Sequence, residues 1–199
     1  RTCPRLGEGL RRCVCADSRG RGGGLMARII IVFMLLFAAG LGGLLYYQQV
    51  YAYYEEVGFS EDAVLMTRVD TDATWPIVVN TFDAIDAISS PLRYRACFQT
   101  PLRGPALAQT YEIVGNAEPR VAPRWFDCFD AGQIGADLQS GVATAFMGIE
   151  NVQYGIDRIV AIYPDGRGYA WHQINACGEV VFDGNRPPED CPPIPESTE

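Results

Sequence analysis

An uninterrupted apolar segment near the start of the chain limits what the rest of the chain can fold into. Residues Ile29–Tyr47 read IIIVFMLLFAAGLGGLLYY and contain no charged residue and no proline. About 20 apolar residues in a helix that rises 1.5 Å per residue cross the ~30 Å hydrocarbon core of a bilayer. A buried helix of a globular domain is normally amphipathic, whereas this segment is apolar on every side. The sequence therefore predicts a transmembrane anchor over residues 26–47, with residues 29–47 in contact with membrane lipid.

A cleaved signal peptide is the alternative to an anchor. Met26-Ala27-Arg28 is typical of a signal peptide's charged start, and Ala38-Ala39-Gly40 offers small residues for cleavage. However, the apolar run continues past Gly40 and ends in a cluster of tyrosines that suits the lipid headgroup region. We therefore expect an uncleaved helix, followed by a stalk over residues 48–58.

Charge is distributed unevenly along the chain. All 16 basic residues are arginines; seven of them, with two acids, lie in residues 1–28, and residues 29–199 hold nine with 22 acids, a net charge of −13. An acidic domain of this kind argues against nucleic-acid binding. Arg28 before the helix and Glu55-Glu56 after it predict a cytoplasmic N-terminus and a periplasmic domain, as in a single-pass protein of the bacterial inner membrane.

Residues 1–25 differ in composition from the rest. They are rich in Arg and Gly, have no apolar period, and precede Met26, where a short charged start would begin. We expect this stretch to be an untranslated or disordered basic extension. Its Cys3, Cys13 and Cys15 have no accompanying histidine, so they give only a weak metal-binding pattern, and neither a metal nor a cofactor is predicted.

Four cysteines follow the anchor, namely Cys97, Cys128, Cys177 and Cys191. An even number in an oxidising compartment indicates two disulfides. Zinc is the rival interpretation, but no pair has C-x₂₋₄-C spacing and His172 is the only histidine. Of the three possible pairings we favour Cys97–Cys128 and Cys177–Cys191, because each closes a modest loop between neighbouring elements.

The residues after the stalk predict an α+β domain over 59–185, with an antiparallel sheet and two or three short helices, followed by a Pro-rich tail over 186–199. Its clearest part is a three-stranded meander with turns at Pro164-Asp165-Gly166 and Ala176-Cys177-Gly178. Asp130 is expected to cap the helix that follows it. Strands are predicted over Ala63–Val69, Ile77–Val79, Leu92–Thr100, Trp125–Phe129, Val142–Ile149, Ile156–Tyr163, Tyr169–Asn175 and Glu179–Phe182, and helices over Phe82–Ile88, Pro105–Val114 and Ala131–Ser140.

Three residues are candidates for ligand binding. Arg93 and Arg95 alternate onto one face of a predicted strand, where two guanidinium groups could bind a carboxylate or phosphate. In so acidic a domain, pairing with its own carboxylates is the favoured alternative. His172 lies in the middle of another predicted strand, where a hydrogen-bonded structural role is the alternative. No phosphate-binding loop, dinucleotide fingerprint or G-x-S-x-G is present, so no catalytic residue is assigned.

Long runs of the chain resemble a family of small single-span alphaproteobacterial proteins of the Rhodobacter–Roseobacter kind. The likeness covers roughly Met26–Glu196 and is carried by AIDAISSPLRYRACF, by the stretch from APRWFDCFDAGQIGADLQ to VVFDG, and by PPEDCPPIPE. This family is a domain of unknown function, so the resemblance implies no catalytic residue. A "histidine kinase" label found on relatives is not supported, because the single histidine lies in a predicted strand and no ATP-binding module is present.

Two functions follow from these observations. The first is a non-enzymatic, membrane-anchored periplasmic domain that binds a protein partner, within an envelope complex or its assembly. The second is a small-molecule sensor or enzyme domain that uses Arg93, Arg95 and His172, which requires these side chains to meet in one pocket.

The predicted topology can be tested with reporter fusions. A reporter joined after Glu199 should be active when it works only outside the cytoplasm, because the domain is expected in the periplasm. Activity of a cytoplasm-only reporter at the same junction would contradict both this orientation and the argument for disulfides.

Overall fold

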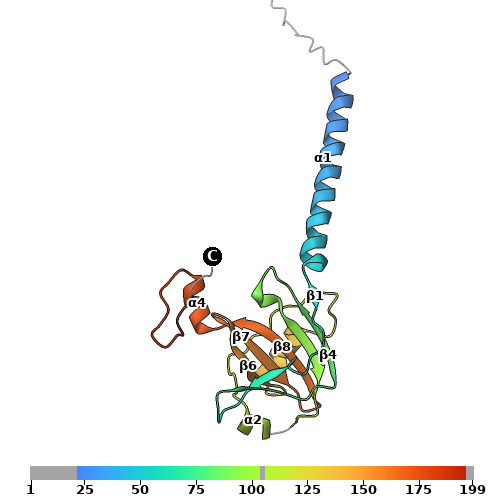
Figure 1. Ribbon diagram of the computed structural model, residues 1–199. Coiled ribbons are helices and arrows are strands. Elements are labelled where there is room, and N and C mark those ends of the chain that lie inside the picture. Colours follow the sequence, from blue (N-terminus) through green and yellow to red (C-terminus); the bar gives the residue numbers. More distant parts are fainter. Residues whose placement is uncertain (1–21, 104–105, 196–199) are drawn as a thin grey trace, which may run out of the picture. The chain divides into compact units, whose positions relative to one another are not determined.

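The computed structural model describes residues 22–103 and 106–195, and it divides the chain into two compact units that meet between Tyr46 and Tyr47 (Figure 1). The first unit consists of helix α1 (Gly22–Tyr47) up to Tyr46. Residues 22–25, expected to belong to a disordered or untranslated extension, are therefore helical. The rest of that extension, with Cys3, Cys13 and Cys15, lies outside the described residues.

Helix α1 has the composition of a membrane span. It continues into a short π-helix, η1 (Gln48–Ala52). Within Gly24–Ala52, a window of 18 residues has a mean hydropathy of 2.5, and none of that window is buried. Within the described ranges this is the one helix long and apolar enough to cross a membrane, and a signal sequence would have the same character. The predicted apolar helix is present.

The second unit is built on a six-stranded antiparallel sheet with the strand order β1-β4-β5-β8-β7-β6. A separate two-stranded sheet and three short α-helices complete an α+β fold, which agrees with the predicted class. The strands are β1 (Glu55–Glu56), β2 (Leu65–Thr67), β3 (Thr74–Pro76), β4 (Thr81–Asp86), β5 (Arg95–Gln99), β6 (Thr144–Gln153), β7 (Ile156–Ile162) and β8 (Arg167–Ile174), and the helices are η2 (Pro91–Arg93, 3₁₀), α2 (Ala106–Thr110), α3 (Ala131–Gln139) and α4 (Ala176–Phe182).

Strands β7 and β8 form the predicted hairpin in the middle of the sheet. Gly166 has a φ of +91° in the turn between them, a conformation that favours glycine. Apolar side chains alternate onto both faces of the hairpin, so that Val160 and Ala170 face one core while Ile159 and Trp171 face the other. The sheet therefore needs a cover on each side.

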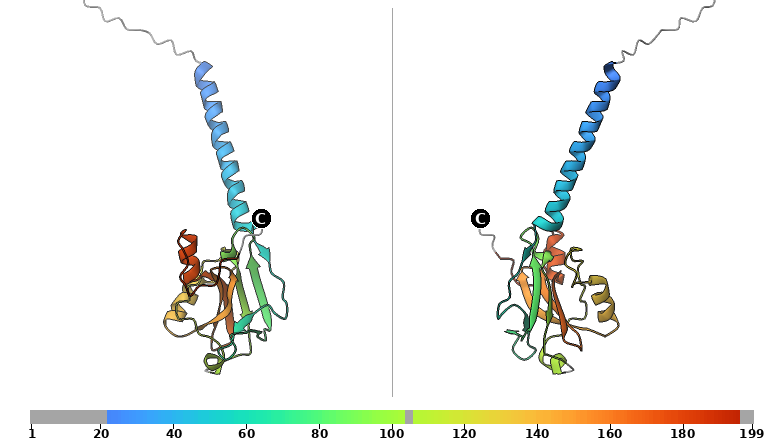
Figure 2. Two further views of the ribbon diagram at one scale, coloured as in Figure 1. Left: turned by 60° about the vertical axis from the view of Figure 1, so that its left-hand side comes forward. Right: turned by 90° about the vertical axis from the view of Figure 1, so that its right-hand side faces the viewer.

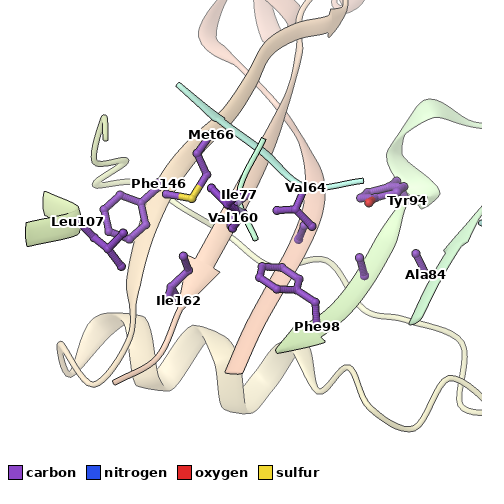
Figure 3. Close-up of a cluster of buried hydrophobic side chains, with 12 residues drawn as sticks. Val64, Met66, Ile77, Ala84, Tyr94, Phe98, Leu107, Phe146, Val160 and Ile162 are labelled. Atoms are coloured by element: carbon purple, nitrogen blue, oxygen red, sulfur yellow. The ribbon is translucent and has the colours of Figure 1, made fainter. Parts of the chain in front are cut away.

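The first core lies between the sheet and the segment that contains β2 and β3 (Figure 3). Val64, Met66 and Ile77 come from this covering segment and meet Phe146 and Val160 of the sheet. Thr67 strengthens the attachment, since its hydroxyl donates a hydrogen bond of 3.1 Å to the Gly148 carbonyl.

The second core lies on the opposite face, under α3 (Figure 2). Ile134 of α3 is buried in this core with Trp171 and Ile159. The helix begins where the sequence predicts, because an Asp130 carboxylate oxygen accepts a hydrogen bond of 3.1 Å from the Gln133 N–H. The predicted helix over Ala131–Ser140 is therefore confirmed to within one residue.

Two predicted elements have the wrong type. Phe82–Ile88 is not a helix: residues 81–86 form β4, whose pairing with β5 buries Ala84 on one face and Ile85 on the other. Glu179–Phe182 is not a third strand of the meander but part of α4, which starts because the Asn175 side chain accepts a hydrogen bond of 2.9 Å from the Gly178 N–H. Here tertiary pairing and a cap override local propensity.

Other predicted boundaries also shift. Trp125–Phe129 forms turns rather than a strand, and Ile77–Val79 follows β3 instead of forming a strand of its own. The predicted helix over Pro105–Val114 is helical only over Ala106–Thr110 within the described part, and Leu92 and Arg93 belong to the 3₁₀ turn η2 instead of strand β5.

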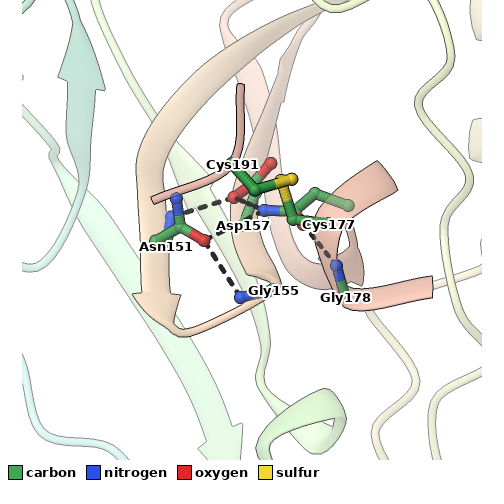
Figure 4. Close-up of a disulfide and its surroundings, with 7 residues drawn as sticks. Asn151, Gly155, Asp157, Cys177, Gly178 and Cys191 are labelled. Atoms are coloured by element: carbon green, nitrogen blue, oxygen red, sulfur yellow. Dashed lines mark hydrogen bonds between the residues drawn. A yellow bond between two sulfur atoms is a disulfide. The ribbon is translucent and has the colours of Figure 1, made fainter. Parts of the chain in front are cut away.

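The structure contains disulfides Cys97–Cys128 and Cys177–Cys191, the two pairs expected from the sequence. Their Cα atoms are 6.3 Å and 5.8 Å apart. The first joins β5 to the loop before α3. The second joins α4 to the Pro-rich tail, next to a network in which Asn151, Asp157 and Asn175 bond one another and the turn between β6 and β7 (Figure 4).

Gly178 provides a test of how closely α4 packs on the turn between β6 and β7. A Cβ atom at Gly178 would lie 2.1 Å from the Gly155 carbonyl oxygen, and backbone cannot move aside as a flexible side chain does. We expect Gly178→Ala to lower the free energy of unfolding by about 2–3 kcal/mol. The matched change Gly135→Ala in α3, where a Cβ meets nothing closer than 3.9 Å, should raise it by about 0.5–1 kcal/mol through helix propensity. Urea unfolding measures both, and equal effects would contradict the packing.

Candidate functional site

His172 lies opposite Arg158 in the pairing of β8 with β7. Directly paired residues of antiparallel strands project from the same face, so the two side chains are neighbours. The imidazole Nε2 accepts a hydrogen bond of 3.0 Å from the Arg158 Nε–H, and Nδ1 faces the Pro91 carbonyl oxygen. Since a carbonyl can only accept, Nδ1 carries the proton and the ring is neutral.

Burial explains why His172 stays neutral. The residue is only 5% exposed. Desolvation is the main reason that its pKa falls to about 4; Arg158 and Arg95 lower it further, and the Pro91 hydrogen bond opposes them. Both ring nitrogens are occupied, so His172 acts as a fixed acceptor that orients Arg158.

Tyr94 completes a stack with these two residues. The Arg158 guanidinium carbon lies 4.0 Å from the centroid of the Tyr94 ring, and the His172 ring stacks on the same tyrosine with centroids 4.8 Å apart. Burial raises the pKa of Tyr94 and keeps its phenol neutral. Arg158 is therefore held by a cation–π contact and by its Nε–H, which leaves the Nη1 and Nη2 edge of the guanidinium free of hydrogen bonds and ion pairs among the described residues.

This edge belongs to a cavity of about 590 Å³. The lining residues come from β1 and the residue after it, the end of β4 and the two residues after it, η2, the end of β6, and the β7–β8 pair: Glu55, Glu56, Val57, Asp86, Ala87, Ile88, Pro91, Val152, Gln153, Arg158 and His172. Asp86 is half-buried, and burial raises its pKa, although the Ala87 N–H at 2.8 Å and the charge of Arg158 act in the other direction. The cavity thus combines one guanidinium with three carboxyl groups.

Arg95, a predicted ligand-binding residue, lies elsewhere and is 4% exposed. Its three side-chain nitrogens donate to the backbone carbonyls of Leu92, Tyr94, Arg120 and Val121 over 2.6–3.3 Å. Desolvation lowers its pKa to about 10, so it remains charged at neutral pH. Its guanidinium anchors the loop at residues 120–121 to β5.

Arg93 does not share a strand face with Arg95, because it ends the 3₁₀ turn η2 instead of entering β5. Its guanidinium carbon lies 5.4 Å from the Tyr54 ring centroid. Of the three predicted ligand-binding residues only His172 lines the cavity, and its neighbour there is Arg158, which the sequence analysis did not single out. The sequence does contain a signal for this pairing. Arg158 and His172 are equally far in sequence from Asp165 at the tip of the predicted hairpin, so a hairpin with that turn places them opposite each other.

A second hollow, of about 620 Å³, runs beside the outer edge of β4; we call it the edge groove. One wall is the segment Glu56–Phe59, and the other is the loop Trp125–Cys128. Cys97–Cys128 ties that loop to β5, and the Trp125 Nε1–H donates a hydrogen bond of 2.7 Å to the Val50 carbonyl. The groove therefore has aromatic walls on a braced loop, and its charged lining residues are Glu56, Asp83 and Asp127.

Within residues 22–103 and 106–195, no group of three or more His, Cys, Asp or Glu side chains is placed to hold a metal ion. The cysteines of the weak C-x-C pattern lie outside these ranges.

The chain matches the model of a known protein family. A model of a family of unknown function (DUF6446) matches residues 64–192. No curated protein and no solved structure matches the chain.

The neutral state of His172 predicts how stability depends on pH. Because the folded pKa of about 4 lies below the ordinary 6.5, the unfolded chain is protonated first as the pH falls. The contribution of His172 is complete above about pH 6.5 and is lost as the pH falls toward 4. Between pH 7 and pH 4.5 the wild-type chain should lose about 2 kcal/mol more than His172→Gln in urea unfolding. An equal loss in both proteins would mean that the histidine is not held neutral.

Proposed function

The chain belongs to the family of unknown function DUF6446, and we propose that it is a membrane-anchored periplasmic binding protein. In this proposal the edge groove of the domain receives an extended segment of a partner protein in the inner membrane or periplasm, and the chain itself catalyses no reaction. The observation that carries the proposal is the partly open edge of β4 inside a groove with aromatic walls and acidic charge.

The anchor rests on α1 and its continuation. A 26-residue helix with no acidic residue in its first turn and exposed apolar side chains along its length suits a lipid environment better than water. The two disulfides favour an oxidising compartment for the domain, and Arg28 before the apolar run favours a cytoplasmic N-terminus. Together they support a single-pass protein of the bacterial inner membrane.

The edge of β4 offers backbone groups for strand addition. Strand β1 pairs only with Ile85 and Asp86, and the Val57 N–H adds one bond to the Ala84 carbonyl. Residues Thr81–Asp83 have a strand partner on the β5 side but not on the other among the described residues. An added peptide strand can bond such an edge while its alternate side chains enter the groove.

The lining of the groove indicates which segment would fit. Phe59 and Phe82 meet edge-to-face with ring centroids 6.1 Å apart, and Trp125 and Phe126 are among the lining residues of the other wall. No basic residue is among the groove's lining residues, whereas three acids are. A partner segment that alternates basic and apolar residues would complement both features.

A catalytic role has less support. His172 has a pKa of about 4 and both of its nitrogens are engaged, so it is poorly suited to general acid–base work near neutral pH. The three side-chain nitrogens of Arg95 already donate hydrogen bonds to backbone carbonyls.

Photo-crosslinking in intact membranes tests the groove. A benzoylphenylalanine at Phe59, on the rim, should crosslink one partner through a basic, extended segment, whereas the same residue at exposed Val69 should not. Asp83→Asn with Asp127→Asn should reduce the crosslink about fivefold, since two surface charges contribute roughly 1 kcal/mol.

The matched control is Glu189→Gln with Asp190→Asn, which removes the same charge from the exposed tail and should leave the crosslink unchanged. Crosslinks that are equally strong from Val69, or that survive neutralisation of the groove, would exclude this surface as the binding site.

A further inference from the structure

We propose that the cavity at Arg158 is a second binding site, which adjoins the edge groove along Glu56 and Val57 and takes a small zwitterion such as a free α-amino acid. The carboxylate of the ligand would pair with Arg158, and its ammonium group would lie against Asp86 and Glu55. The cavity lies on the face of the sheet that carries the first core, whereas the Trp125 wall of the edge groove is braced from the opposite face.

The way in which Arg158 is held indicates where the carboxylate of the ligand would bind. The Nε–H is directed at His172, and the plane of the guanidinium rests on Tyr94 at 4.0 Å. The group is thereby oriented before any ligand arrives, and it presents the Nη1–Nη2 edge, whose two parallel N–H groups match the two oxygens of a carboxylate. No carboxylate of the described residues lies within 4.0 Å of this edge, although three line the same cavity.

The pairing of two acidic residues in the sheet indicates where the ammonium group of the ligand would bind. Glu55 of β1 is paired directly with Asp86 of β4, so two carboxyl side chains stand opposite each other on one face. Like charges in such a pair are destabilising, and neither residue has a basic partner in an ion pair among the described residues. A cationic group between them would be attracted to both carboxyl groups.

The balance of charge selects a zwitterion over a simple anion. Three carboxyl groups and one guanidinium line the cavity, so an inorganic phosphate or a bare carboxylate would meet net repulsion there. A volume of about 590 Å³ is also in the range of small-ligand sites.

Calorimetry on the detergent-solubilised full chain tests the proposal with four sets of probes: the twenty standard L-amino acids one at a time, acetate, methylammonium and inorganic phosphate. At least one amino acid should bind at least tenfold more tightly than the other three probes. Arg158→Lys, which keeps the charge but loses the two-pronged edge, should weaken that binding about tenfold.

Asp86→Asn is a second variant that leaves Arg158 and its supports in place, and it should weaken the same binding about fivefold. Arg186→Gln, an exposed arginine elsewhere, should bind as wild type does, and unfolding temperatures show whether each variant is folded. Binding of no amino acid, equal binding of acetate or phosphate, or wild-type affinity in Asp86→Asn would overturn the proposal.

Discussion

The register between β7 and β8 is the constraint on which the rest of the domain depends. Both strands are buried on both faces, so Ile159 and Trp171 must enter one core while Val160 and Ala170 enter the other. A shift of this register by one residue would exchange the two faces and place the large apolar side chains on the wrong face of the sheet. The same register places Arg158 beside His172, so the polar cavity is a by-product of the pairing that builds the cores.

Local rules explain what could be predicted from the sequence. The turn at Pro164-Asp165-Gly166, the cap at Asp130 and the two cysteine pairs each depend on residues near one another in the chain or on parity, and the structure contains all of them. Phe82–Ile88 was predicted as a helix because its apolar spacing fits one. Pairing with β5, a contact across the fold, makes it a strand, and no local pattern reveals such a partner.

The candidate site was predicted only in part for a related reason. His172 is a candidate because it is the single histidine of the sequence. Its environment, however, depends on the Tyr94 ring and the Pro91 carbonyl, which come from η2 and the residue that follows it, far from His172 in the chain. Arg95 is a residue type that often binds anionic ligands. In the structure its guanidinium instead donates hydrogen bonds to backbone carbonyls of a distant loop. The edge groove joins segments around residues 57, 82 and 126, so it exists only after the chain has folded.

The hydrogen bond from Trp125 to the Val50 carbonyl has a mechanical consequence. Tyr51 and Tyr54 also pack on this indole, with ring centroids 6.3 Å and 5.8 Å away, and Cys97–Cys128 closes the loop that carries it. The segment that leads into the sheet is therefore held at two points: at Val50 by the indole and at β1 by its short pairing with β4. A tensile load applied at Tyr47 is shared between these two attachments, and the disulfide passes part of it into the middle of the sheet.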